Sequence, residues 1–366
     1  MLSFRTKGYN GYGIQYSPFF DNKIAVATSA NYGLVGNGKL FILAIDPSGA
    51  IHEQRSWMTQ DGLFSLSWSE INENQVVVSS GDGSIKMFDI NVPEFPVMQW
   101  KEHSREVFAV NFNLVDKTNF VSSSWDGQIK VFSPNRPESL LTLHANHPDF
   151  STKVAPVQQH PPGQAPPVHH QPQHQGIDTG NCVYEAQFSP HSPSQIFSCT
   201  GAGKVQIWDI RDRNPLQKEF TAHSGFEVLL VGPNFYRPTI LASGGSDKSV
   251  LIWDFRIISD TPHIRGPSPL NLFHGHHMAV KRVKWSPFDG KELVLASYDM
   301  TSRVWQDSTD ERARFLRAGA PLKAVFLGHS EFVMDCDYSL WGEPGWIGTT
   351  GWDEMVYIWN SNRHLV

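Results

Sequence analysis

The stretch WDGQIKVF, residues 125–132, is one copy of a short pattern that the chain repeats. In each copy an aspartate is followed six residues later by a large aromatic residue, with apolar residues alternating between them. The clear copies pair Asp82 with Phe88, Asp126 with Phe132, Asp247 with Trp253, Asp299 with Trp305, and Asp353 with Trp359. Alternation over so few residues is typical of a half-buried β-strand that follows a turn. The repeat therefore predicts many short strands joined by similar turns.

Two weaker copies bring the number to seven, with Ala202 before Trp208 and Asn37 before Leu43. A second landmark stands 23 or 24 residues before most of the aspartates. It is a histidine in four copies, His103, His223, His276 and His329. Strand-like runs between and after the landmarks give four strands per copy, and four strands in roughly 40–45 residues is the period of a WD repeat. The sequence thus predicts an all-β fold, a seven-bladed WD-repeat β-propeller.

Closing the ring also makes a prediction about the N-terminal residues. A four-stranded sheet leaves both of its faces uncovered, and a ring of similar sheets covers them while leaving only short, protected edges. After Trp359 the chain continues only as NSNRHLV, which is too short for the outer strand of the last blade. We expect LSFRTK, residues 2–7, to complete that seventh sheet. The predicted domain organisation is one propeller over residues 1–366.

The repeated His and Asp residues are predicted to be structural. An aspartate in a tight turn can bond the histidine of an adjacent loop, which can in turn reach a strand hydroxyl and then the Trp N–H. Satisfied buried networks of this kind hold one register. The residues predicted to form such networks are His103, Ser124 and Asp126 in one blade, and His276, Ser297, Asp299 and Trp305 in another. We interpret them as scaffold rather than as catalytic dyads.

One segment interrupts the repeat. The step from Asp126 to Ala202 is longer than the other steps, and the excess at residues 146–179 contains QQHPPGQAPPVHHQPQHQG. Proline, glutamine and histidine crowd this stretch, and few of its residues could build a core, so we expect a disordered loop inserted in the propeller. Its histidines could in principle bind a metal. We do not predict a metal site there, because a flexible tract lacks supporting side chains.

Composition and charge exclude several classes of function. The net charge of −6 gives no general attraction to nucleic acid or to anionic membranes. Three cysteines without a CxxC pair argue against a disulfide scaffold, and no stretch is long and apolar enough for a membrane helix or a secretory signal. No glycine-rich loop opens a helix, and neither GxSxG nor HExxH occurs. We expect a soluble intracellular binding protein without cofactor, metal or catalysis.

One face of the ring is the predicted binding surface. Because the Asp turns contact the His loops, both must lie on the same face. Three of the seven positions just before the turn aspartate are aromatic, more than the 12% aromatic content of the chain would supply. The residues predicted to bind a ligand are these aromatics, Trp125, Tyr298 and Trp352, and the acids just after the His position, Asp61, Glu106, Glu227 and Glu331. Acids ringed by aromatics indicate a ligand that is cationic and partly apolar.

Several stretches outside the generic WD pattern resemble one family. They are GYGIQYSPFFDNKIAVATSANYGLVGNGKLFIL (11–43), TQDGLFSLSWSE (59–70), EHSREVFAVNFNL (102–114), FVSSSWDGQIKVFSP (120–134) and HSEFVMDCDYSLW (329–341). All are similar to the receptors for the type 2 peroxisomal targeting signal, the peroxin-7 family. The similarity covers nearly the whole chain outside the Pro/Gln/His-rich segment.

The resemblance implies a function and partners. Such receptors bind, in the cytoplasm, an N-terminal signal of the form Arg-(Leu/Val/Ile/Gln)-five residues-(His/Gln)-(Leu/Ala). With a co-receptor they deliver the cargo protein to docking proteins of the peroxisomal membrane, and they shuttle between cytoplasm and peroxisome. On this basis Asp61 in TQDGLF and Glu106 in HSREVF are the first choices for partners of the arginine in the signal.

Two other hypotheses share the fold argument. A generic WD-repeat scaffold or substrate adaptor of another multiprotein complex would differ only in its rim. An enzyme using the rim acids would need a carboxylate pair with a raised pKa, and the sequence offers no pairing signal. Binding of a peptide that carries the signal separates the receptor hypothesis from both.

Overall fold

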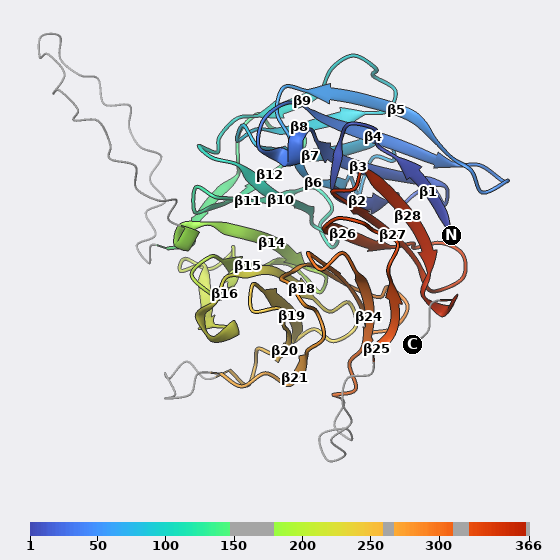
Figure 1. Cartoon of the computed structure of the whole chain (residues 1–366). Coiled ribbons are helices and arrows are strands. Elements are labelled where there is room, and N and C mark those ends of the chain that lie inside the picture. Colours follow the sequence, from blue (N-terminus) through green and yellow to red (C-terminus); the bar gives the residue numbers. More distant parts are fainter. Residues whose placement is uncertain (147–178, 259–266, 310–321, 364–366) are drawn as a thin grey trace, which may run out of the picture.

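A computed structural model of the chain describes residues 1–146, 179–258, 267–309 and 322–363. It contains seven antiparallel sheets of four strands each, arranged around a ring (Figure 1). The inner strands of successive sheets contact one another all the way around, including the last strand of the ring against the first. The predicted seven-bladed β-propeller is confirmed.

We number the sheets as blades 1 to 7 in chain order and give their strands from the inner to the outer one. Blade 1 consists of β2 (Asn10–Tyr16), β3 (Lys23–Ser29), β4 (Gly38–Ile45) and β5 (Ile51–Thr59), and blade 2 of β6 (Leu63–Trp68), β7 (Gln75–Ser80), β8 (Ile85–Asp89) and β9 (Met98–Trp100). Blade 3 consists of β10 (Val107–Phe112), β11 (Phe120–Ser124), β12 (Gln128–Phe132) and β13 (Leu141–His144), and blade 4 of β14 (Val183–Ser189), β15 (Ser192–Thr200), β16 (Lys204–Asp209) and β17 (Leu216–Thr221). Blade 5 consists of β18 (Val228–Pro233), β19 (Ile240–Gly245), β20 (Val250–Asp254) and β21 (Asn271–Phe273), and blade 6 of β22 (Val280–Trp285), β23 (Glu292–Ser297), β24 (Ser302–Gln306) and β25 (Leu322–Phe326). Blade 7 consists of β26 (Val333–Tyr338), β27 (Trp346–Gly351), β28 (Met355–Asn360) and β1 (Leu2–Arg5). Short 3-10 helices lie at Asn31–Gly33 (η1), Thr179–Asn181 (η2), His223–Gly225 (η3) and Ser361–Arg363 (η5).

The N-terminal strand closes the ring, as predicted from LSFRTK. β1 pairs antiparallel with β28, Leu2 opposite Ile358 and Arg5 opposite Met355. An ion pair of 3.1 Å between Arg5 and Glu354 adds to this pairing. In Figure 1 the blue β1 lies beside the red β28, so the two ends of the chain meet in one blade.

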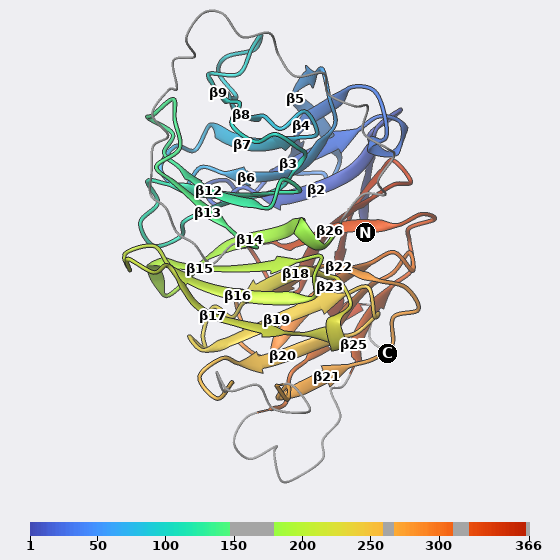
Figure 2. The ribbon, with the colours of Figure 1, turned by 90° about the vertical axis from the view of Figure 1, so that its left-hand side faces the viewer.

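The core lies between the blades, because each sheet is covered on both faces by its neighbours. The middle strands are accordingly buried along almost their whole length, as in β11 and β19. The aromatic residue that ends the sequence repeat fills the space between adjacent sheets, and Phe132, Trp208 and Trp359 are fully buried there. Figure 2 shows blade 4 side on, with β14, β15, β16 and β17 following one another across the sheet.

The His–Asp networks are present, and blade 5 holds a complete one. His223 Nδ1 lies 2.8 Å from Asp247 Oδ1, and His223 Nε2 lies 2.8 Å from Ser243 Oγ. The indole N–H of Trp253 donates to the same Ser243 Oγ at 2.8 Å. Loop, turn and two strands of one blade are therefore linked by one continuous chain of hydrogen bonds.

The sequence prediction placed the strand hydroxyl that contacts the histidine two residues too far along the chain. His103 Nδ1 bonds Asp126 at 2.9 Å as predicted, but His103 Nε2 contacts Ser122, at 2.8 Å, and not Ser124. Ser124 Oγ instead donates to the carbonyl of Arg105. Residues two apart in a strand point to the same side of the sheet, so the sequence pattern does not decide which of them the histidine reaches.

Blade 6 shows the same displacement with a different consequence. His276 Nδ1 bonds Asp299 at 2.9 Å, and Ser297 Oγ donates to the carbonyl of Ala279 at 2.9 Å. The position equivalent to Ser122 holds Leu295, which has no hydroxyl. Within the described residues neither His276 Nε2 nor the N–H of Trp305 has a hydrogen-bond partner. The set predicted as complete in this blade is therefore interrupted at Leu295.

The predicted insertion at 146–179 lies outside the described residues, apart from its two end positions. Asn146 Nδ2 donates to Asn181 Oδ1 at 3.0 Å, so the chain leaves and re-enters the propeller at neighbouring points. This placement is what an insertion between two blades requires, since the ring itself is uninterrupted.

A buried ion network crosses the central channel. Arg282 on β22 lies 2.5 Å from Glu185 on β14 and 2.9 Å from Asp335 on β26, and all three residues are buried. Asp335 also accepts a hydrogen bond from the backbone N–H of Ile14, 3.0 Å away on β2. Four blades are thus joined through Arg282, whose single positive charge is shared by two carboxylates, and Lys281 interacts electrostatically with the same two groups.

Arg282→Met should lower the free energy of unfolding by about 3–5 kcal/mol, because it leaves Glu185 and Asp335 buried without their cation. Urea unfolding followed by fluorescence measures the effect. Arg211→Met is the matched control: Arg211 pairs with Asp209 at the surface with 72% of its side chain exposed, so its loss should have little effect on stability. Equal effects of the two substitutions would contradict a structural role for the network.

Asp337 follows Asp335 by two residues on β26, and its environment leads us to predict that the stability of the protein depends on pH. Burial raises its pKa to about 6, although nearby Lys284 opposes the shift. The folded protein therefore favours the protonated carboxyl: its contribution to stability is complete below the unfolded pKa near 3.8 and is lost as pH rises through 6. Asp337→Asn should make the protein more stable than wild type by about 1–3 kcal/mol above pH 6, with the difference vanishing near pH 4. Urea unfolding from pH 4 to 8 tests this; a difference independent of pH would contradict it.

Candidate functional site

The His loops and the Asp turns lie on one face of the ring, which we call the His–Asp face. Bonds between His103 and Asp126, His223 and Asp247, His276 and Asp299, and His329 and Asp353 place loop and turn together in four blades. Burial alone would raise the pKa of Asp126, but hydrogen bonds from His103 and from backbone N–H groups bring it below its usual value. The carboxylate of Asp126 is therefore stabilised in its charged form.

Aromatic rings form a continuous arc on this face. The members, in spatial order, are Tyr298, Phe332, Trp352, Tyr12, Phe64, Phe108, Trp125 and Tyr184. Successive ring centroids are 4.6–6.2 Å apart, and Phe108 stacks on Trp125 at 4.6 Å with only 4° between their planes. We call these eight residues the aromatic arc. It runs from blade 6 through blades 7, 1, 2 and 3 to blade 4.

The structure brings together all three aromatics predicted from the sequence, Trp125, Tyr298 and Trp352. They are half-buried rather than fully exposed, because neighbouring members of the arc pack against them. The other five members were not predicted. Four of them, Tyr12, Phe64, Phe108 and Tyr184, share one position near the beginning of the inner strand. That shared position is a sequence signal that could have identified them.

The four predicted acids are half-buried at the same face. Asp61 lies beside the arc: a side chain added to Gly81 would come within 3.0 Å of Asp61 Oδ1 and 3.1 Å of the Phe64 ring. Glu227 accepts a hydrogen bond from the hydroxyl of Tyr184 at 3.2 Å. Glu331 precedes Phe332 in the chain. The four acids lie on four different loops, between β5 and β6, β9 and β10, β17 and β18, and β25 and β26.

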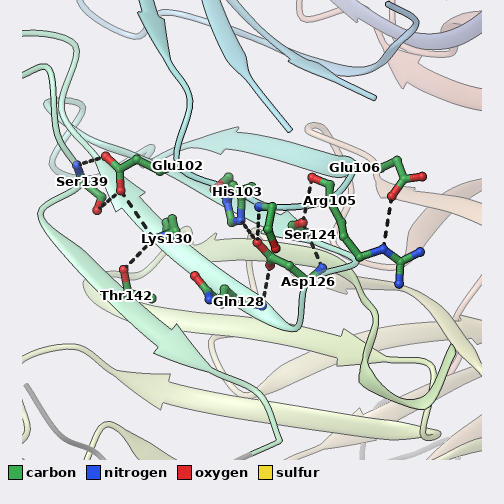
Figure 3. Close-up of polar contacts among 12 residues, drawn as sticks. Glu102, His103, Arg105, Glu106, Ser124, Asp126, Gln128, Lys130, Ser139 and Thr142 are labelled. Atoms are coloured by element: carbon green, nitrogen blue, oxygen red, sulfur yellow. Dashed lines mark hydrogen bonds and ion pairs between the residues drawn. The ribbon is translucent and has the colours of Figure 1, made fainter. Parts of the chain in front are cut away.

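Glu106 is already paired with a cation (Figure 3). Its Oε2 lies 3.5 Å from Nε of Arg105, and both side chains are about one-third exposed, at 36% and 37%. The guanidinium carbon of Arg105 also lies over the Trp125 ring, 5.4 Å from its centroid. A surface pair of this kind is weak. Arg105 of the protein itself thus contacts both the carboxylate of Glu106 and the ring face of Trp125 in the candidate site.

A second cation lies at the entrance to the channel. Lys281 Nζ on β22 is 5.3 Å from the centroid of Phe108 on the far side of the ring. Burial lowers the pKa of Lys281 to about 8, with a further contribution from Arg282 and opposition from Glu185. The arc therefore contacts cations at two places, as the negative faces of aromatic rings favour.

The described residues contain no group of three or more His, Cys, Asp or Glu side chains that could hold a metal ion. Among the helices of the described chain, none has the length and apolar character needed to cross a membrane.

The repeats identify the class of the protein. Residues 94–133, 214–254 and 267–306 match the family model described as "WD domain, G-beta repeat". Together with the seven observed blades, this match defines the chain as a WD-repeat β-propeller.

Whole-chain relatives identify the family within that class. The chain is 49% identical to the peroxisomal targeting signal 2 receptor of Komagataella phaffii, over 99% of this chain and 100% of that protein. It is 43% identical to the receptor of the same name from Saccharomyces cerevisiae and 31% identical to that of Schizosaccharomyces pombe, again over 99% of this chain and 100% of each relative. The chain belongs to the family of peroxisomal targeting signal 2 receptors.

Proposed function

We propose that the protein is a cytoplasmic import receptor that binds the N-terminal type 2 targeting signal of cargo proteins on its His–Asp face. With a co-receptor it delivers them to docking proteins at the peroxisomal membrane. Membership of the family supports the role of import receptor. The placement of the binding site rests on one observation, the aromatic arc bordered by separate carboxylates. No catalytic step is part of this function.

The shape and charge of the signal fit the arc. Residues seven apart in an α-helix differ by only about 20° in direction, so both conserved pairs of the signal lie on one helical face. A helix laid along the arc would place its apolar side chains against half-buried rings such as Trp125, Tyr298 and Trp352. Its arginine would meet a carboxylate at the rim, with Asp61 and Glu106 as the first choices and Glu227 and Glu331 as further ones. This is the helix-in-groove mode of peptide recognition.

Asp61→Ala and Glu106→Ala should each weaken binding of a fluorescent peptide that carries the signal. A hydrogen bond between charged groups contributes about 1.5–3 kcal/mol, which corresponds to a roughly ten- to hundredfold increase in Kd. Fluorescence anisotropy measures it. Glu94→Ala, an exposed acid between β8 and β9, is the control and should leave Kd unchanged. Absence of saturable binding by the wild type, or indifference to replacing the arginine of the peptide, would overturn the proposed function.

Arg105→Ala should act in the opposite direction and tighten binding. The arginine of the signal would compete with Arg105 for Glu106 and for the face of Trp125, and the pair to be broken is worth at most about 1 kcal/mol. The expected gain is therefore up to roughly fivefold in Kd at low salt. Lys101→Ala removes a nearby positive charge that pairs with Asp82 instead, and controls for net charge. If Arg105→Ala weakened binding, Arg105 would be a contact of the peptide rather than its competitor.

A further inference from the structure

The opposite face of the ring also carries a built site. The inner strands end there, about 20 Å from the aromatic arc for a strand of six residues. A cavity of about 450 Å³ opens among these ends and is lined by residues of all seven blades. Its wall includes the aromatic residues Tyr16, Phe188, Trp285 and Tyr338 beside polar ones such as Gln15 and Asn111. Cavities of this size with aromatic walls and a few polar groups are typical binding sites.

Exposed apolar side chains gather on the loops of this face, and four of them, Leu114, Phe235, Tyr236 and Leu340, line the cavity itself. They belong to the loops that join the first strand of a blade to the second, and they are exposed to between 37% and 54%. The set is Phe19, Ile71, Leu114, Val115, Phe235, Tyr236, Phe288, Leu340 and Trp341. Six of the seven blades contribute to it. We call this set the apolar collar. Large apolar residues gathered around one opening mark an interaction surface rather than ordinary scattered exposure.

The charge of the same loops indicates the chemistry of what binds. The loops carry six carboxylates, Asp21, Glu70, Glu73, Asp116, Asp289 and Glu343, against three basic residues, Lys117, Arg237 and Lys291. Lys117 pairs with Glu70 at 3.7 Å and Arg237 with Asp307 at 2.7 Å, so these cations are already used within the chain. Within the described residues the side chains of Asp21, Glu73 and Glu343 have neither a hydrogen bond nor an ion pair.

The cavity itself holds a carboxylate that is available to a ligand. Asp337 lines the cavity, and its Oδ2 accepts the backbone N–H of Tyr16 at 2.9 Å. Lys284 lines the same cavity from β22 of the neighbouring blade and interacts electrostatically with Asp337, but no direct ion pair joins the two side chains in the described chain. The pKa of Asp337 is raised to about 6 mainly by burial. The charged carboxylate therefore carries a desolvation penalty, which a bound cation would offset.

We propose that the apolar collar and its cavity bind a short apolar segment of a partner protein that carries basic residues on its flanks. One bulky apolar side chain enters the cavity, the others contact the collar, and the basic residues meet the unpaired carboxylates of the loops and Asp337. The two faces of the ring thus bind two different ligands at once. This inference is independent of the proposed function, because it concerns the other end of the inner strands.

The test uses the full chain and a model ligand, an 18-residue peptide with leucines at helical spacing and lysines on its other face, labelled for anisotropy. The same peptide with glutamate in place of lysine is the reference. We expect the lysine peptide to bind at least tenfold more tightly than the glutamate peptide. Leu340→Gln and Leu114→Gln should each weaken it at least fivefold, and Asp337→Asn about as much. Met58→Gln is the control and should have no effect: Met58 is an apolar residue on the outer strand β5 that is exposed to 62%, more than Leu340 at 46% or Leu114 at 40%.

Other outcomes separate the alternatives. The targeting-signal peptide should not displace the lysine peptide, and Leu340→Gln should leave targeting-signal binding unchanged. Displacement would place the lysine peptide on the His–Asp face and overturn the proposal, as would equal affinity for the two peptides or indifference to the leucine substitutions. A wild-type dimer that Leu340→Gln converts to a monomer, seen by light scattering, would show instead that this face binds a second copy of the chain. Failure of the targeting-signal peptide to bind would affect only the proposed function.

Discussion

The pairing of β1 with β28 is the contact on which the rest of the structure depends. A propeller has no single core; each sheet is covered by its two neighbours, so every blade needs both of them in place. The last blade receives its fourth strand from the other end of the chain. Without it β28 would present an unpaired edge, and the packing between blades 7 and 1 would lose the strand that holds it in register.

The aromatic arc crosses the seam that this pairing closes. Tyr12 on blade 1 contacts Trp352 on blade 7, with ring centroids 6.0 Å apart. Asn10 reinforces the same junction: its Nδ2 donates to the carbonyl of Trp352 at 2.6 Å, and its Oδ1 accepts the backbone N–H of Tyr32. The proposed binding surface is therefore formed by the closed ring, and no half of the chain carries it alone. If the arc binds the targeting signal as proposed, closure of the ring serves both stability and recognition.

Charge is distributed differently inside the ring and at its two rims. In the channel Arg282 pairs with both Glu185 and Asp335, and Lys281 interacts electrostatically with the same two carboxylates, so these charges are balanced within the ring. At the rims, Asp61 and Glu331 have no cation of the described chain paired with them, and Glu106 has only the weak pair with Arg105. Compensated charges hold blades together, whereas uncompensated ones at a water-accessible rim are available to a cationic ligand at a small cost in desolvation.

The amino-acid sequence by itself determined the number of blades, the role of LSFRTK in closing the ring, and the His–Asp pairs. These features repeat at a fixed period or follow from counting strands, and they involve residues of one blade. It also identified Trp125, Tyr298 and Trp352, because the turn aspartate fixes their place. It did not identify Ser122 in place of Ser124, since both point to the same side of β11.

Only the tertiary structure decided which residues of different blades meet. Phe64 and Phe108 join the arc because their inner strands stand next to one another in the ring. Glu185 and Arg282 are 97 residues apart in the chain, yet they are in hydrogen-bond contact across the channel. Ile14 and Asp335 are 321 apart, yet they are hydrogen-bonded between the neighbouring blades 1 and 7. A period in the sequence records what recurs within each blade, whereas contacts across the ring depend on closure, which brings together side chains that share no local pattern.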